Sequence, residues 1–224
     1  MENELREKFL NAFPEKFLKR LYERQASIYQ QTVAMSFQDQ PWDSHEAYEI
    51  LPHIRRATME AAMRKSAIEA GLRTANLPHK GKNCGCVHVK SAGFTLTGHY
   101  VCNPKEFVRE AESRKQNRGL NQWLDYHIDE RLLVRPAPRL DSRPVYVNLL
   151  YGGVFPSRKN DTLTLDPTTF FLNIAVPSAD MPQYQWAPWS VQDLLRRYAE
   201  MPASQEEPQA VIADTARPTK KRKA

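Results

Sequence analysis

The sequence predicts an α+β protein in which N-terminal helices precede a β-β-α-β-β-α unit, a mixed or antiparallel sheet layer, and a disordered basic C-terminal tail follows. Three observations predict this order. Apolar residues recur at helical spacing in the first third, short β-favouring runs begin after residue 78, and the chain ends in a polar, basic stretch. We expect a helical region at 1–77, an α+β sheet domain at 78–200, either separate or on one core, and a tail at 201–224.

The N-terminal region is predicted to hold three helices. Leu5 and Phe9 begin the first apolar pattern. Pro14 fits the first turn of the second helix, where its missing N–H costs nothing. The third is expected to begin near Ser44 and to break or kink at Pro52.

The next region begins with a hairpin signal. Two β-favouring runs, at 87–89 and 94–101, flank the turn residues Ser91-Ala92-Gly93. The segment Asn103-Pro104-Lys105-Glu106 then predicts a helix start, because Asn can cap, Pro suits the first helical position and Glu can reach back to the cap.

Two near-continuous apolar runs, at 145–150 and 170–176, predict strands that are covered on both faces. The pair Gly152-Gly153 follows the first run, but neither phosphate-loop spacing is present, so a tight turn is the better interpretation. Ser190 is predicted to begin a last helix that ends near Glu200.

Positive charge is concentrated at the C-terminus. The formal net charge is +6, and the last eight residues include Arg217, Lys220, Lys221, Arg222 and Lys223. A segment of this kind cannot bury apolar area, so we expect it to stay disordered and to bind polyanions such as nucleic acid. It is also similar to a nuclear-import signal.

A second group of basic residues lies between residues 53 and 82. These residues scatter around a helical wheel, which is typical of a solvated helix surface. The alternative is non-specific phosphate contact that cooperates with the tail. The nucleic-acid-binding residues predicted with the tail are Arg55, Arg56, Arg64, Lys65, Lys80 and Lys82.

Cysteine and histidine gather around the predicted hairpin. Cys84, Cys86, His99 and Cys102 are candidate zinc ligands, since facing strands can bring two pairs together. However, C-x-C on a strand places its sulfurs about 7 Å apart, which is awkward for one metal ion. Free thiols are the favoured interpretation, and we expect no metal and no cofactor.

An acidic segment offers the main catalytic alternative. Asp125 and Asp129 would share one face of a helix, next to His127 and Glu130, and could hold a divalent cation in a metal-dependent nuclease. The competing interpretation is a solvated helix face. His45 begins a metalloprotease-like spacing, but Glu49 stands where that motif needs a second histidine.

The aromatic segment 177–189 and the amphipathic N-terminal helices suggest a second alternative, a protein-interaction module or adaptor subunit. Tyr184, Trp186 and Trp189 lie in this segment without any basic residue, which favours a sheet-edge cap or an apolar docking patch over base stacking.

The composition, 41% hydrophobic and 26% charged, is that of an ordinary globular protein. No apolar run reaches the roughly 18 residues of a membrane span, and the N-terminus lacks a signal-peptide pattern. We therefore expect a soluble protein with no membrane partner, in the cytoplasm, or in the nucleus if the source is a eukaryote or its virus. The leading hypothesis is a non-enzymatic, nucleic-acid-associated regulatory or accessory protein.

Overall fold

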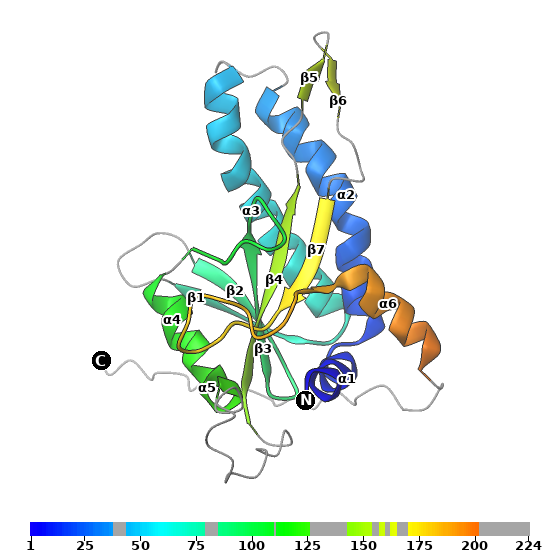
Figure 1. The fold of residues 1–224 in the computed structure, drawn as a ribbon. Coiled ribbons are helices and arrows are strands. Elements are labelled where there is room, and N and C mark those ends of the chain that lie inside the picture. The colour runs from blue at the N-terminus through cyan, green and yellow to red at the C-terminus, as the bar shows by residue number, and fades with distance from the viewer. Residues whose placement is uncertain are drawn as a thin grey trace, which may run out of the picture.

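The computed structural model describes residues 1–37, 44–78, 85–109, 111–125, 143–153, 157–159, 162–164 and 170–201. Its N-terminal helices and mixed six-stranded sheet confirm the predicted α+β class (Figure 1). The predicted tail lies outside the described residues, apart from Met201. No helix in the described part of the chain is long and apolar enough to span a membrane.

Helices dominate the first third of the chain and recur between and after the strands. They are α1 (Glu2–Ala12), α2 (Glu15–Phe37), α3 (Ser44–Glu69), α4 (Glu112–Arg118), the 3-10 turn η1 (Gly119–Asn121), α5 (Gln122–Asp125) and α6 (Val191–Glu200). The strands are β1 (Arg73–Pro78), β2 (Gly85–Ser91), β3 (Phe94–Tyr100), β4 (Val145–Gly153), β5 (Ser157–Lys159), β6 (Thr162–Thr164), β7 (Phe170–Ala175) and β8 (Trp189–Ser190).

The main sheet has the strand order β1-β2-β3-β4-β7-β8, and β5 and β6 form a separate pair. The central strands β3 and β4 are parallel, with Phe94 opposite Val145, and the other neighbours are antiparallel. The predicted hairpin is confirmed as β2 and β3. Its turn uses positive φ at Ala92 (40°) and Gly93 (85°), the backbone that a tight hairpin needs.

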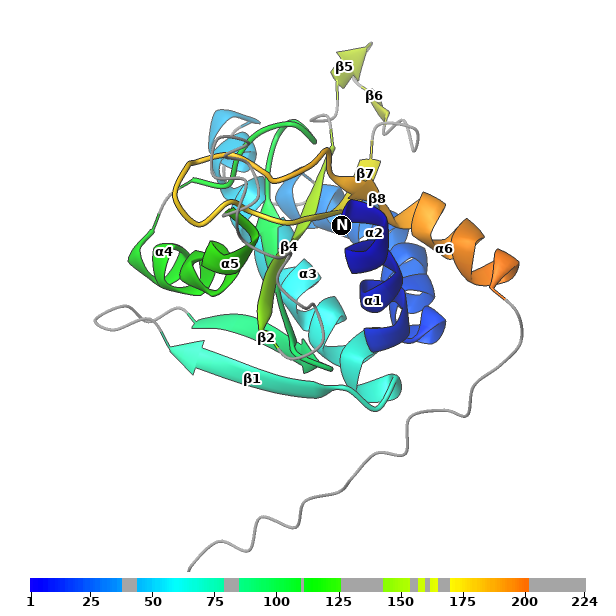
Figure 2. The same ribbon diagram turned by 60° about the horizontal axis from the view of Figure 1, so that its bottom comes forward.

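One face of the sheet is apolar and carries the main core. Alternate residues such as Leu96, Val147 and Ile174 point to this face and are fully buried. Phe9 from α1 packs edge-on against Phe94, with ring centroids 5.7 Å apart. The same buried cluster includes residues of α1, α2, α3 and α6, so it spans the expected boundary at residue 77. Figure 2 shows these helices together on one side of β4.

The opposite face of the sheet carries buried polar residues such as Thr97 and Asn148. Helices α4 and α5 lie on this side of β4 (Figure 2). Asn121 in η1 is fully buried and joins this layer to the sheet. Its side-chain amide donates to the carbonyl oxygens of Tyr146 and Pro177, each at 2.8 Å, and its oxygen accepts from the backbone N–H of Tyr146 at 2.8 Å. One side chain therefore ties β4 to both the helical layer and the segment after β7.

Two predictions about element boundaries are wrong. Pro52 does not break α3, which runs through it from Ser44 to Glu69. The sheet also begins earlier than expected, because Arg73–Pro78 already forms β1 and pairs with β2 along its length. This edge strand is stabilised by that pairing, and its sequence lacks the apolar alternation that would have predicted it.

The predicted helix start at Asn103 is also wrong, since α4 begins at Glu112. Part of the expected cap forms, since the Asn103 side-chain oxygen accepts from the N–H of Lys105 at 2.9 Å. The Glu106 carboxylate accepts from the N–H of Cys102 at 3.0 Å, one residue before the expected Asn103. The turn does not continue as a helix, and the Tyr184 hydroxyl donates to the Glu106 carbonyl at 3.0 Å. A tertiary contact thus takes an acceptor that a helix would use for its own backbone.

Replacing Asn121 with alanine should lower the free energy of unfolding by about 2–4 kcal/mol, because buried backbone groups on β4 would lose their partners. Urea titration followed by circular dichroism measures the loss. Asn3→Ala, at an exposed site on α1, is the matched control and should change stability by less than about 0.5 kcal/mol. Equal effects of the two substitutions would contradict this role for Asn121.

Gly152→Ala should be among the most destabilising alanine substitutions, by about 3 kcal/mol or more. A Cβ at Gly152 would lie 2.0 Å from the carbonyl oxygen of Val101 and 2.4 Å from the Phe171 ring. Gly119→Ala is the control, because a Cβ there meets nothing within 4 Å. Thermal unfolding should show a large loss for the first variant and no loss for the second.

Candidate anion-binding cleft

A cleft of about 430 Å³ opens at the carboxyl end of β3. Its walls come from the N-terminal half of α3, from the segment that follows β3, and from α4. Its floor is the polar face of the sheet, where Thr97, His99 and Tyr146 line it. In volume it falls within the range of small-molecule sites.

Three arginines line this cleft from three different parts of the chain: Arg56 from α3, Arg109 from the segment after β3 and Arg114 from α4. Arg114 is half-buried, and its Nε is buried without a hydrogen-bond partner among the described residues. Burial lowers the pKa of Arg114, and the charges of Arg56 and Arg109 lower it further. A cation held in this way is destabilised by its surroundings, and a bound anion would offset that cost.

Two carboxylates, Glu60 and Glu106, also line the cleft, but both have partners. The Glu60 carboxylate accepts from Nε of Arg56 at 3.2 Å. The Glu106 carboxylate accepts from the backbone N–H of Cys102. Neither Arg109 nor Arg114 forms an ion pair within the part of the chain that the structure describes.

The floor of the cleft is a neutral hydrogen-bonded group. The Thr97 hydroxyl lies 2.7 Å from Nε2 of His99 and 2.7 Å from the Tyr146 hydroxyl. Burial lowers the pKa of His99 to about 3, helped by the nearby charges of Arg114 and Arg56. Burial also raises the pKa of Tyr146 to about 12. At neutral pH the floor therefore offers hydroxyl and imidazole groups without charge.

The candidate zinc ligands that the structure describes lie at this same cleft. Cys86, His99 and Cys102 line it, and Cys84 lies outside the described residues. Among residues with described side chains, no three His, Cys, Asp or Glu are placed to hold one metal ion. The Cys86 sulfur instead lies 3.1 Å from Nε2 of His88, and burial raises its pKa, which disfavours the thiolate that metals and electrophiles require.

The basic residues predicted from sequence are divided by the fold. Arg56 lines the cleft, whereas Arg55 is fully buried, with its guanidinium 4.2 Å from the centre of the Tyr29 ring. Surface phosphate contact is therefore wrong for Arg55 in this structure. Arg64 donates to the Asn76 side-chain oxygen at 3.0 Å, and Lys65 is exposed. Outside the described residues lie Lys80, Lys82, Arg217, Lys220, Lys221, Arg222 and Lys223.

Sequence reasoning missed Arg109 and Arg114. The available signal was the density of basic residues between 109 and 118, where Arg109, Arg114, Lys115 and Arg118 fall within ten positions. We expected one continuous helix from Asn103. In the structure Arg109 lies in an irregular segment and Arg114 in the short helix α4, so their arrangement could not be predicted from that helix.

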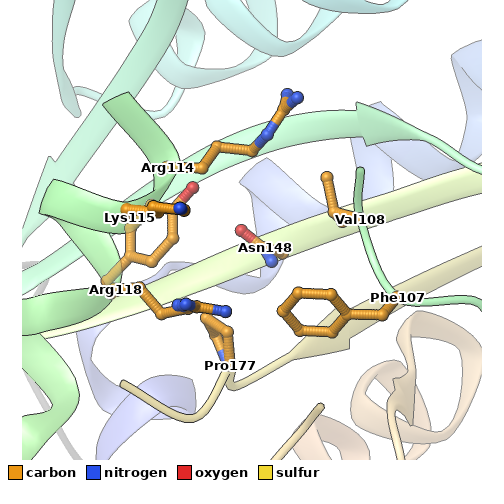
Figure 3. Close-up of a pocket in the computed structure, with 8 residues that line it drawn as sticks. Phe107, Val108, Arg114, Lys115, Arg118, Asn148 and Pro177 are labelled. Carbon is orange, nitrogen blue, oxygen red and sulfur yellow. The ribbon is translucent and has the colours of Figure 1, made fainter. Parts of the chain in front are cut away.

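A second, much smaller cavity of about 10 Å³ adjoins the cleft and holds no more than about one water molecule. Arg114 lines both cavities, and Figure 3 shows its side chain extending away from Pro177. Arg118 lies on the other side, toward Phe107, with its guanidinium 5.7 Å from that ring. The two arginines of α4 thus have different surroundings, and Arg114 is the one placed in the larger cleft.

The remaining candidates from the sequence are the acidic segment and the aromatic segment. Asp125 ends α5, and the other acidic candidates, Asp129 and Glu130 with His127, lie outside the described residues. The aromatic segment lies at the edge of the sheet, where Trp189 belongs to the last strand, β8. Trp189 is buried and donates to Glu2 at 3.1 Å, Trp186 packs against the core, and Tyr184 is held by Glu106.

The chain matches no protein-family model, and no curated protein or solved structure matches it.

His99 should make stability depend on pH in a defined direction. Its pKa is 6.5 in an exposed state and about 3 in the fold, so the unfolded chain binds more protons between these values. The contribution of His99 to the free energy of unfolding is complete above about pH 6.5. It is lost as pH falls toward 3, by up to about 1.4 kcal/mol per pH unit. Urea titrations from pH 7 to 4 should show a shallower loss for His99→Gln than for the unmodified protein.

The matched control is His45→Gln, because His45 is 82% exposed at the start of α3. It should retain the full pH dependence. Parallel curves for the unmodified protein and His99→Gln would show that His99 is not the responsible group.

Proposed function

We propose that this protein is a nucleic-acid-associated regulatory or accessory protein that holds phosphate groups in the cleft between α3 and α4. The observation that carries the proposal is the convergence of Arg56, Arg109 and Arg114 on one cavity, with Arg114 half-buried among like charges. Guanidinium groups match phosphate oxygens in geometry as well as charge, and phosphate contacts dominate nucleic-acid affinity.

The basic tail predicted from the sequence supports the same ligand class. It would add salt-sensitive contacts to a site that the folded part provides. The cleft has room for a ligand of several atoms. Its arginines therefore have space to bind a partner, which favours this role over a purely structural one.

The rival hypotheses have less support. The nuclease hypothesis rests on Asp125, which ends α5, and on Asp129 and Glu130, which lie outside the described residues, so the structure adds no geometry to the sequence argument. The adaptor hypothesis rested on the aromatic segment 177–189 and on the amphipathic N-terminal helices. Several of these aromatic side chains pack inward, and the apolar residues of α1 and α2 belong to the main core. We keep the cytoplasm as the proposed location, or the nucleus in a eukaryotic host.

The proposal predicts that labelled single- and double-stranded DNA and RNA bind with steep salt dependence. Fluorescence anisotropy across a salt series, with the full-length protein and a 1–216 truncation, measures it. Arg114→Ala should weaken binding about tenfold, since a charged hydrogen bond is lost, and should reduce the slope of log affinity against log salt by about 1.

Arg196→Ala is the control, because Arg196 is 68% exposed on α6, on the helical layer over the other face of the sheet. It should leave binding and slope within about twofold of the unmodified protein. Absence of binding to every nucleic acid at low salt would overturn the proposal and make the adaptor hypothesis the leading one. Tail-dependent binding that ignores Arg114 would remove the cleft from it.

A further inference from the structure

We propose that the cleft binds a phosphomonoester, the terminal phosphate of a strand or of a nucleotide, in preference to the phosphodiester within a strand. This inference rests on the proposed function and specifies which phosphate the cleft takes. Three features of the cleft support it: the closed floor, the two guanidinium groups of Arg109 and Arg114, and the neutral polar groups beneath them.

The floor of the cleft excludes a ligand that must continue through it. Strands β3 and β4 lie side by side beneath the opening, and Thr97 and Tyr146 on that floor are each 1% exposed. A phosphodiester carries a substituent on both sides, so its chain must leave the cavity twice. A phosphomonoester carries one substituent and can enter with its three unsubstituted oxygens first.

The guanidinium donors also fit a monoester. Glu60 is paired with Arg56, whereas Glu106 accepts from a backbone N–H and keeps its negative charge. Arg109 and Arg114 form no ion pair in the described part of the chain, and each can donate to two oxygens of one anion. A phosphomonoester carries about −1.5 to −2 at neutral pH and presents its unsubstituted oxygens on one side. An internal diester has fewer unsubstituted oxygens and less charge to share between the two guanidinium groups.

The neutral groups of the cleft suit the atoms next to such a phosphate. Ser113 and Asn117 line the α4 wall, and the hydroxyls of Thr97 and Tyr146 lie on the floor. None of these four groups carries a negative charge that would repel the anion. They offer donors and acceptors for the remaining phosphate oxygen or for a sugar hydroxyl. A single nucleotide fits a cavity of about 430 Å³, whereas a folded strand does not.

The test compares one oligonucleotide sequence in four forms: with a 5′-phosphate, with a 3′-phosphate, with hydroxyls at both ends, and as a closed circle. Binding of each labelled form to the full-length protein is measured by fluorescence anisotropy at fixed salt. We expect at least one phosphorylated form to bind about tenfold more tightly than the hydroxyl and circular forms. A nucleoside monophosphate should compete with it, and the unphosphorylated nucleoside should not.

Arg114→Gln should abolish the preference for the terminal phosphate, because the phosphorylated forms lose a guanidinium partner and should then bind no more tightly than the hydroxyl form. Arg196→Gln is the matched control and should keep the preference. Arg109→Gln, at an exposed position, provides a second variant should Arg114→Gln fail to fold, and it should reduce the preference at least threefold.

The outcomes separate this inference from the proposed function. Equal affinity for phosphorylated, hydroxyl and circular forms, still dependent on Arg114, would overturn the inference and leave the proposed function standing. Binding of the nucleoside monophosphate alone, lost in Arg114→Gln, would support the phosphomonoester site and overturn the nucleic-acid ligand. Binding to nothing would overturn both.

Discussion

The parallel pairing of β3 with β4 is the constraint on which the rest of the structure depends. Side chains of a strand alternate between the two faces, so one register assigns every residue of both strands to a side. Leu96 and Val147 then point toward α1, α2 and α3, and Thr97 and Asn148 point the other way. A slip of one residue would place the polar set in the main core. The core and the floor of the cleft are therefore two consequences of one register.

The polar face is held by specific hydrogen bonds more than by apolar burial. Its own apolar cluster is small, formed by Val101, Val108, Leu150 and Ala175 with two aromatic neighbours. Asn121 and the Tyr184 hydroxyl bind backbone groups of segments that would otherwise lack regular partners. Buried polar groups are costly when unpaired, so these hydrogen bonds favour one arrangement of the loop after β3 and of α4. They do so although little apolar area is buried on this face. That fixed geometry determines the second wall of the cleft.

Part of the positive charge in this chain serves the fold itself. In the described part, guanidinium groups lie over aromatic rings in four places: Arg6 on Trp189, Arg55 on Tyr29, Arg118 on Phe107 and Arg143 on Trp123. A ring face attracts a cation and covers its apolar stem, so these contacts help to hold the arginine side chains within the fold. A count of basic residues consequently overstates the charge available to a polyanion, and Arg114 is distinguished by its cleft and like-charged neighbours.

The sequence by itself determined the α+β class, the helical N-terminal third, the hairpin around Ala92 and the last helix from Ser190, because each follows from local periodicity, turn residues or capping. The edge strand β1, the non-helical turn at Asn103 and the opposite fates of the adjacent Arg55 and Arg56 depended on tertiary structure. Pairing with β2 forms the edge strand β1. A hydrogen bond from Tyr184, 78 positions away, takes the Glu106 carbonyl near the turn at Asn103. The side of α3 that meets Tyr29 determines that Arg55 is buried. Contacts between distant segments also place Arg109 and Arg114 near Arg56 in one cleft. Such contacts cannot be predicted from local sequence patterns.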